Sequence, residues 1–126
     1  MQTEIKYRTK QIGLKVIQLI DGLPNKSSAW VIAKQIVRSS TSIGANYRAA
    51  CRAKSVPDFI NKLKIVEEET DETLYWLELL EESSLVQKAS IIDLLKEINE
   101  ILSIIVASIN TAKNNQNKSS IVNLKS

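Results

Sequence analysis

The residues best suited to chemistry are the carboxylates of "EEETDE" at 67–72 and the single cysteine, Cys51. The sequence contains no histidine, which excludes a Ser-His or Cys-His nucleophile and a Glu-x-x-His di-iron site. Oxygen ligands alone can hold Mg²⁺, but consecutive residues of a helix point in different directions and do not converge on one ion. We therefore expect no catalytic residue, no metal and no cofactor, and we expect Cys51 to pack among small residues.

Basic side chains follow one face of the segment 29–53, within about 80° of arc if the segment is helical. The stripe consists of Lys34, Arg38, Arg48 and Arg52. It predicts sequence-independent binding to the phosphates of RNA or DNA, with an affinity that falls steeply with salt. The aromatic residues of this segment, Trp30 and Tyr47, lie on another stripe. Contact with the backbone of structured RNA or duplex DNA is therefore favoured over the reading of single strands.

A structural role for the same arginines is the alternative. Residues 1–64 contain twelve Lys and Arg against three acids, whereas residues 65–100 contain eleven acids against two lysines. Two halves of opposite charge can neutralise each other within one bundle. In that case Glu69 and Glu72 are the expected ion-pair partners of the arginines.

The two interpretations differ in what replacement of Arg48 and Arg52 by Gln would do. If the arginines bind phosphates, nucleic-acid affinity falls and the melting temperature hardly changes. If they are structural, buried carboxylates lose their partners and stability falls. We expect a mixed outcome, in which Arg48 is structural and Arg38 and Arg52 are more exposed.

Hydrophobic periodicity places all these residues on long helices. The predicted helices cover about 4–21, 29–53 and 55–82, and a last one runs from a cap at Ser84 to about 112. The links between them are short, so neighbouring helices must alternate in direction. The sequence thus predicts an all-α fold, an antiparallel up-down-up-down four-helix bundle over residues 1–113. The polar, aperiodic residues 114–126 predict a flexible C-terminal tail.

Composition favours a cytoplasmic protein without a membrane partner. The N-terminus "MQTEIKYRTK" is charged and lacks the apolar centre of a signal peptide. The most apolar stretch, at 90–109, contains too many charges for a membrane span. One cysteine allows no internal disulfide, which suits a reducing compartment.

Two of the predicted helices have more apolar surface than one core requires. The segment 29–53 has a second apolar stripe beside that of Trp30, and the segment 55–82 has one opposite its core-facing side. Exposed apolar surface usually marks a partner site, so we expect self-association, against the alternative that the last helix covers Trp76. Gly44 costs about 1 kcal/mol relative to Ala in mid-helix, which favours close approach of another helix. The predicted interface residues are Ile32, Ile36, Ile43, Gly44, Ile65, Trp76 and Leu79.

Two blocks of sequence resemble a known family. They are "SSTSIGANYRAACRAKS" at 39–55 and "DFINKLKIVEEETDETLYWLELL" at 58–80. Together they closely resemble the bacterial four-helix-bundle proteins encoded within 23S rRNA intervening sequences, over roughly residues 10–110. The "EEET" at 67–70 is more acidic than that pattern, which argues against anion binding along this segment.

The resemblance implies a four-helix fold. As in related accessory proteins of diversity-generating retroelements, it also implies a ring-shaped homopentamer with nucleic-acid-binding potential. A ring with an odd number of subunits needs two different contact faces on each subunit. We therefore expect a non-enzymatic homo-oligomer that binds RNA or DNA through the basic stripe. The alternative is an oligomeric scaffold whose partner is another protein.

Overall fold

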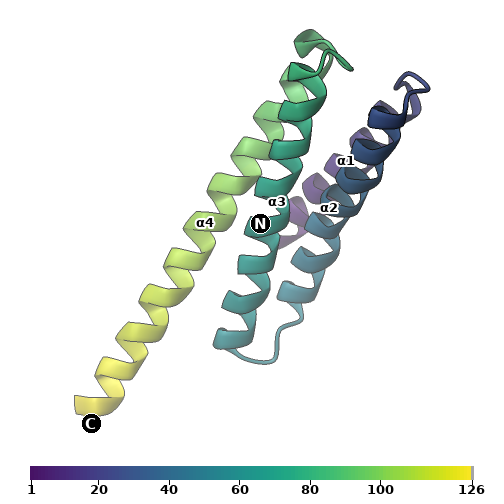
Figure 1. Ribbon diagram of the computed structural model, residues 1–126. Helices are drawn as coiled ribbons and strands as arrows, with labels where there is room; N and C mark the ends of the chain where they lie inside the picture. The colour runs from purple at the N-terminus through teal and green to yellow at the C-terminus, as the bar shows by residue number, and fades with distance from the viewer. Residues whose placement is uncertain (126) are drawn as a thin grey trace.

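The chain forms four α-helices joined by short connections. The computed structural model describes the backbone of residues 1–125 and the side chains of residues 1–118. The helices are α1 (Gln2–Asp21), α2 (Ser27–Cys51), α3 (Val56–Glu82) and α4 (Lys88–Lys125). Successive helices run in opposite directions, as Figure 1 shows. The predicted all-α, up-down-up-down bundle is therefore confirmed over the described residues.

Each helix packs on the next one along the chain, and α1 also contacts α4. The pair α1–α2 and the pair α3–α4 are joined through the contact between α2 and α3 (Figure 1). Because α1 and α2 are antiparallel, the first half of α1 lies beside the second half of α2. This pairing decides which basic residues share one surface.

The connection between α2 and α3 is held by Ser55 and Asp58, whose spacing of three residues is that of a helix capping box. The Ser55 side chain accepts a hydrogen bond from the Asp58 backbone N–H at 3.2 Å. The Asp58 carboxylate in turn accepts one from the Lys54 backbone N–H, also at 3.2 Å. The first bond satisfies an amide donor that the first turn of a helix leaves unpaired, and the second ties the residue before the cap to the start of the helix.

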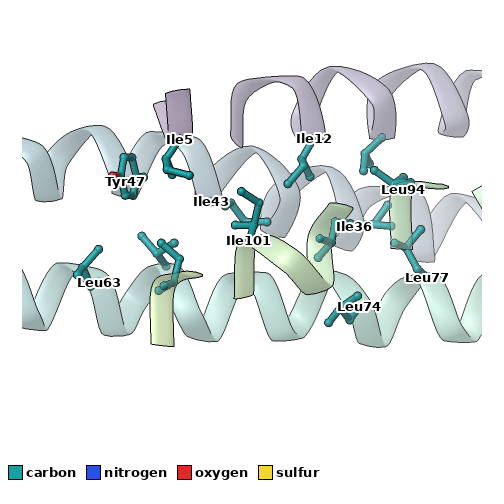
Figure 2. Packing of buried hydrophobic residues seen from close by; sticks show 14 of the residues in the cluster. Ile5, Ile12, Ile36, Ile43, Tyr47, Leu63, Leu74, Leu77, Leu94 and Ile101 are labelled. Atoms are coloured by element: carbon teal, nitrogen blue, oxygen red, sulfur yellow. The ribbon is translucent and has the colours of Figure 1, made fainter. Parts of the chain in front are cut away.

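The core is built mainly from isoleucine and leucine side chains contributed by all four helices (Figure 2). The α2 contribution differs from the sequence expectation. Ile36 and Ile43 are fully buried in it, whereas Trp30, expected to face inward, is 69% exposed. The reason is that α2 is packed between α1 and α3. It therefore buries most of both apolar stripes, with Trp30 at the start of the helix excepted, and the core lies nearer to the second stripe.

Gly44 marks the closest approach of α1 to α2. A Cβ atom on Gly44 would lie 3.4 Å from the Lys10 backbone nitrogen and from the Thr9 carbonyl carbon. The neighbouring helix that the mid-helix glycine predicts is thus α1 of the same subunit. Gly44 is buried there, so its assignment to an interface between subunits is wrong.

α4 is longer than the sequence pattern predicts. It contains 38 residues and continues to Lys125, past the level of the α2–α3 connection (Figure 1). The expected helix end near residue 112 is wrong, and most of the segment 114–126 that was expected to be a flexible tail is helical. Apolar periodicity stops there, but no glycine or proline follows to end the helix. Ser126 lies outside the described residues.

Candidate nucleic-acid interface

A groove of about 590 Å³ runs along the outer surface between α1 and α2. We call it the basic groove. Its lining residues are Lys6, Tyr7, Thr9, Lys10, Gly13, Leu14, Ile17, Thr41, Gly44, Ala45, Arg48 and Arg52. Within residues 1–118, this lining holds four cationic side chains and no carboxylate. The groove is therefore a concentrated positive surface made by two helices.

Helical spacing and antiparallel packing bring the four cations together. Lys6 and Lys10 are one turn apart on α1. Arg48 lies in the last turn of α2, and Arg52, four residues later, caps the C-terminus of that helix. Residues four apart share a helix face, so each helix presents its pair on one side. All four residues are exposed. Among the described residues none of them forms an ion pair, so their charge is available to an anion.

The floor of the groove is small and apolar. Gly44 and Ala45 of α2 and Gly13 of α1 all line it, and a Cβ atom on Gly13 would meet the Thr41 side chain at 3.6 Å. These short side chains leave space between the helices. Leu14 and Ile17 also line the groove, and 43% and 39% of their respective surfaces are exposed.

Arg38 is exposed as expected, with 49% of its side-chain surface accessible, but it also takes the structural role expected for Arg48. Arg38 forms an ion pair with Glu69 at 3.2 Å and a second one with Glu72. Glu72 also accepts a hydrogen bond from Trp76 Nε1 at 3.2 Å. Arg38 therefore links α2 to α3 instead of facing an anion, whereas Arg48, expected to be structural, lines the basic groove.

Two further cations, Lys34 and Lys62, lie outside the basic groove, and only Lys62 adjoins it. Lys34 is exposed on α2 but does not line the basic groove. Lys62 of α3 lines an adjoining hollow together with Arg48 and Arg52. Its ammonium group contacts Asp58 at 2.6 Å, and this hydrogen bond lowers the pKa of the Asp58 carboxyl group. The adjoining hollow is thus partly neutralised at its α3 edge.

Sequence reasoning missed Lys6 and Lys10. The basic stripe was traced along one helix, whereas the groove takes half of its charge from another. The available signal was the i, i+4 spacing of these two lysines in a segment predicted to be antiparallel to the arginine-bearing helix.

The predicted interface residues fall into two groups. Ile36, Ile43 and Gly44 are buried in the subunit itself, so the expectation that they form a surface for a partner is corrected. Ile65 is 42% exposed, and Trp76 and Ile32 are partly buried against the core. Leu79 is also half-buried. The exposed apolar surface at these positions is therefore concentrated at Ile65.

The residues singled out as best suited to chemistry, Cys51 and the carboxylates, form no arrangement typical of a catalytic or metal site within the described residues. Cys51 is half-buried next to Tyr47, and burial together with Cys51 raises the pKa of Tyr47 to about 12. In the described part of the chain, no three His, Cys, Asp or Glu side chains gather as ligands for a metal ion. The same residues include no helix long and apolar enough to cross a bilayer.

Comparison with known proteins places the chain in one family. The profile described as 23S rRNA-intervening sequence protein matches residues 1–107. The fold is similar to the crystal structure of a protein of unknown function from the S23 ribosomal protein family of Bacteroides thetaiotaomicron. The two share 36% identity with a TM-score of 0.80, and the match covers 86% of this chain and 97% of the other. No functionally curated protein shows significant similarity to the chain.

Proposed function

The chain belongs to the 23S rRNA-intervening sequence protein family, and from this premise we propose that it is a non-enzymatic, cytoplasmic protein that binds nucleic acid. The proposed contacts are between phosphates and the basic groove. One observation supports this most directly: two cations of α1 and two at the end of α2 surround one groove whose lining includes no carboxylate within residues 1–118. Such a surface attracts a polyanion along its length.

The chemistry of the four cations suits a phosphate backbone. Arg48 and Arg52 can each donate two parallel hydrogen bonds to one phosphate, and Lys6 and Lys10 add point charges. Because the groove is open and the cations are exposed, phosphates can reach them without displacing a protein partner. Affinity should come mainly from counterion release and should therefore depend on salt more than on sequence.

We further propose that the protein is a homo-oligomer, and that it is a pentamer as the family resemblance implies. Support comes from the exposed apolar residues Ile65 and Tyr75 on α3, which are 42% and 53% exposed. Exposed apolar surface favours association. An oligomer would repeat the basic groove once per subunit and raise the avidity for a long polyanion.

An oligomeric scaffold that binds another protein is the second candidate. The observation that favours it is the pairing of Arg38 with Glu69 and Glu72, which uses one predicted binding residue for internal structure. On this view the basic groove receives an acidic segment of a partner protein. The two candidates differ in one result: only the first predicts that the purified protein binds RNA or DNA without a protein partner.

The test is salt-dependent binding of labelled RNA and DNA. Wild-type protein should bind both at low salt, and affinity should fall linearly on a log–log plot against salt concentration. Arg48→Gln with Arg52→Gln should weaken binding and flatten that slope. Lys34→Gln is the matched control, because Lys34 is exposed on the same helix outside the groove. Absence of binding at low salt would leave the scaffold as the function.

A further inference from the structure

Tyr7 gives the basic groove a feature that phosphate binding does not require. Its side chain lines the groove and is 64% exposed. It lies on α1, one residue from Lys6 and about one turn from Lys10. An aromatic ring on a cationic surface can stack on a base while neighbouring charges hold the adjacent phosphates.

The basic groove also contains exposed apolar side chains, which binding of a phosphate backbone does not require. Leu14 and Ile17 stay 43% and 39% exposed there, and phosphates gain nothing from apolar side chains. The faces of nucleobases are apolar and favour such a surface. The groove volume of about 590 Å³ lies within the range of about 300–1,000 Å³ typical of sites for small organic ligands. A base with its sugar therefore has room to enter.

A duplex cannot use both features. Its base faces are hidden in the stack, and only the edges and the backbone are presented to a protein. A single strand can place its phosphates on the cations and turn a base toward Tyr7 and the apolar floor. The expectation that stacking contributes little arose from the aromatics of one helix alone, and α1 supplies the missing ring.

We propose that the basic groove is a binding site for single-stranded nucleic acid, in which one base stacks on Tyr7 and a neighbouring base packs on Leu14 and Ile17 further along α1. Arg48 and Arg52 hold the phosphates on the opposite wall. This inference rests on the proposed function and adds the class of nucleic acid and the mode of contact to it.

The experiment measures fluorescence anisotropy with short labelled oligouridylate and oligothymidylate. The competitors are an abasic strand of equal length and charge and a duplex of equal length. Wild-type protein should prefer the base-bearing strand to the abasic strand by about tenfold. Tyr7→Leu should remove this preference and leave abasic binding unchanged, and Tyr7→Phe should retain it. Trp30→Leu is the control, because Trp30 is an aromatic residue that is 69% exposed and lies outside the groove.

Each result separates the two proposals. If Tyr7→Leu binds the base-bearing strand like the wild type, or if the duplex binds more tightly, stacking is refuted and backbone binding stands. If no oligonucleotide binds at low salt, the proposed function fails as well. Tighter binding of an acidic amphipathic peptide than of any oligonucleotide would assign the groove to a protein partner and overturn the inference. Circular dichroism of each variant verifies that the helices are intact.

Discussion

Arg8 on α1 and Glu97 on α4 form a two-point ion pair between the first and the last helix of the bundle. Arg8 Nε donates to Glu97 Oε2 at 2.9 Å, and Nη2 donates to Oε1 at 2.7 Å. The two side chains keep only 17% and 25% of their surface exposed. The same guanidinium contacts Glu100 at 3.0 Å. Because no connection joins α1 to α4, this pair fixes their mutual position.

The pair predicts a pH dependence of stability. Hydrogen bonds from Arg8 hold the pKa of Glu97 below its ordinary value of 4.5. The stabilisation is therefore complete above pH 4.5 and is lost as pH falls through the lowered pKa. At neutral pH, Glu97→Gln should reduce the free energy of unfolding by about 1–2 kcal/mol, between the values for surface and buried pairs.

Urea unfolding of wild type and Glu97→Gln across pH checks this prediction. The difference between the two proteins should shrink below pH 4.5. The matched control is Glu100→Gln, because Glu100 is 63% exposed and contributes through a weaker contact. A difference that stays constant down to pH 2 would contradict the assignment.

Most of the fold can be predicted from the sequence because helix number and direction depend on local signals. Apolar periodicity, the Ser55 cap and short links were sufficient. The buried face of α2 was only partly predicted, because a helix packed between two others buries both apolar stripes. The end of α4 was missed for a different reason. Apolar periodicity indicates only the part of a helix that packs against a core. The polar residues 113–118 continue α4 without such packing, so the pattern could not show where the helix ends.

The candidate site was less predictable than the fold. Arg48 and Arg52 were identified from spacing on one helix, but Lys6 and Lys10 join them only through the packing of α1 on α2. Which arginine pairs with Glu69 depends on the relative heights of α2 and α3. Those heights are set by the α2–α3 connection and the core, and no local pattern in either helix encodes them.

Arg38 and Arg48 should respond differently to the same substitution. Arg38→Gln leaves Glu69, which is 18% exposed, without its partner and should cost about 1 kcal/mol. Arg48→Gln removes no ion pair and should change stability by less than about 0.5 kcal/mol. Thermal unfolding of the two variants measures the difference. A larger loss for Arg48→Gln would mean that this arginine has a structural role.

Gly44 should tolerate a methyl group but not a larger side chain. The Lys10 nitrogen and Thr9 carbonyl carbon at 3.4 Å are backbone atoms, which cannot rotate away. Gly44→Leu should therefore destabilise the subunit by about 3 kcal/mol or more, since overpacking forces the helices apart. In Gly44→Ala the gain in helix propensity, about 1 kcal/mol, offsets a tight contact.

Gly13 provides the control for that experiment. A Cβ atom there would be 3.6 Å from the Thr41 side chain, an ordinary contact. Gly13→Ala should therefore raise the free energy of unfolding by up to about 1 kcal/mol. If Gly44→Leu melts like the wild type, α1 and α2 are not in close contact at Gly44.

The last prediction concerns self-association through α3. Ile65 is the most exposed of the apolar residues predicted to form the interface, at 42%. Trp76 is a less informative position. Its ring packs against the core and its Nε1 donates to Glu72, so that Trp76→Glu should destabilise the subunit itself. Ile65→Glu adds a charge to a surface position and should leave the melting temperature of the subunit nearly unchanged.

Light scattering at micromolar concentration should give a mass above that of one subunit, which is 14.1 kDa. Ile65→Glu should lower this mass, because burying an unpaired carboxylate at an interface is strongly unfavourable. Val56→Glu is the matched control, since Val56 is 48% exposed in the first turn of α3, where a carboxylate is tolerated. A monomeric wild type would refute the oligomer. An unchanged mass for Ile65→Glu would place the contact on another face, and loss of assembly without loss of helix content would locate it on α3.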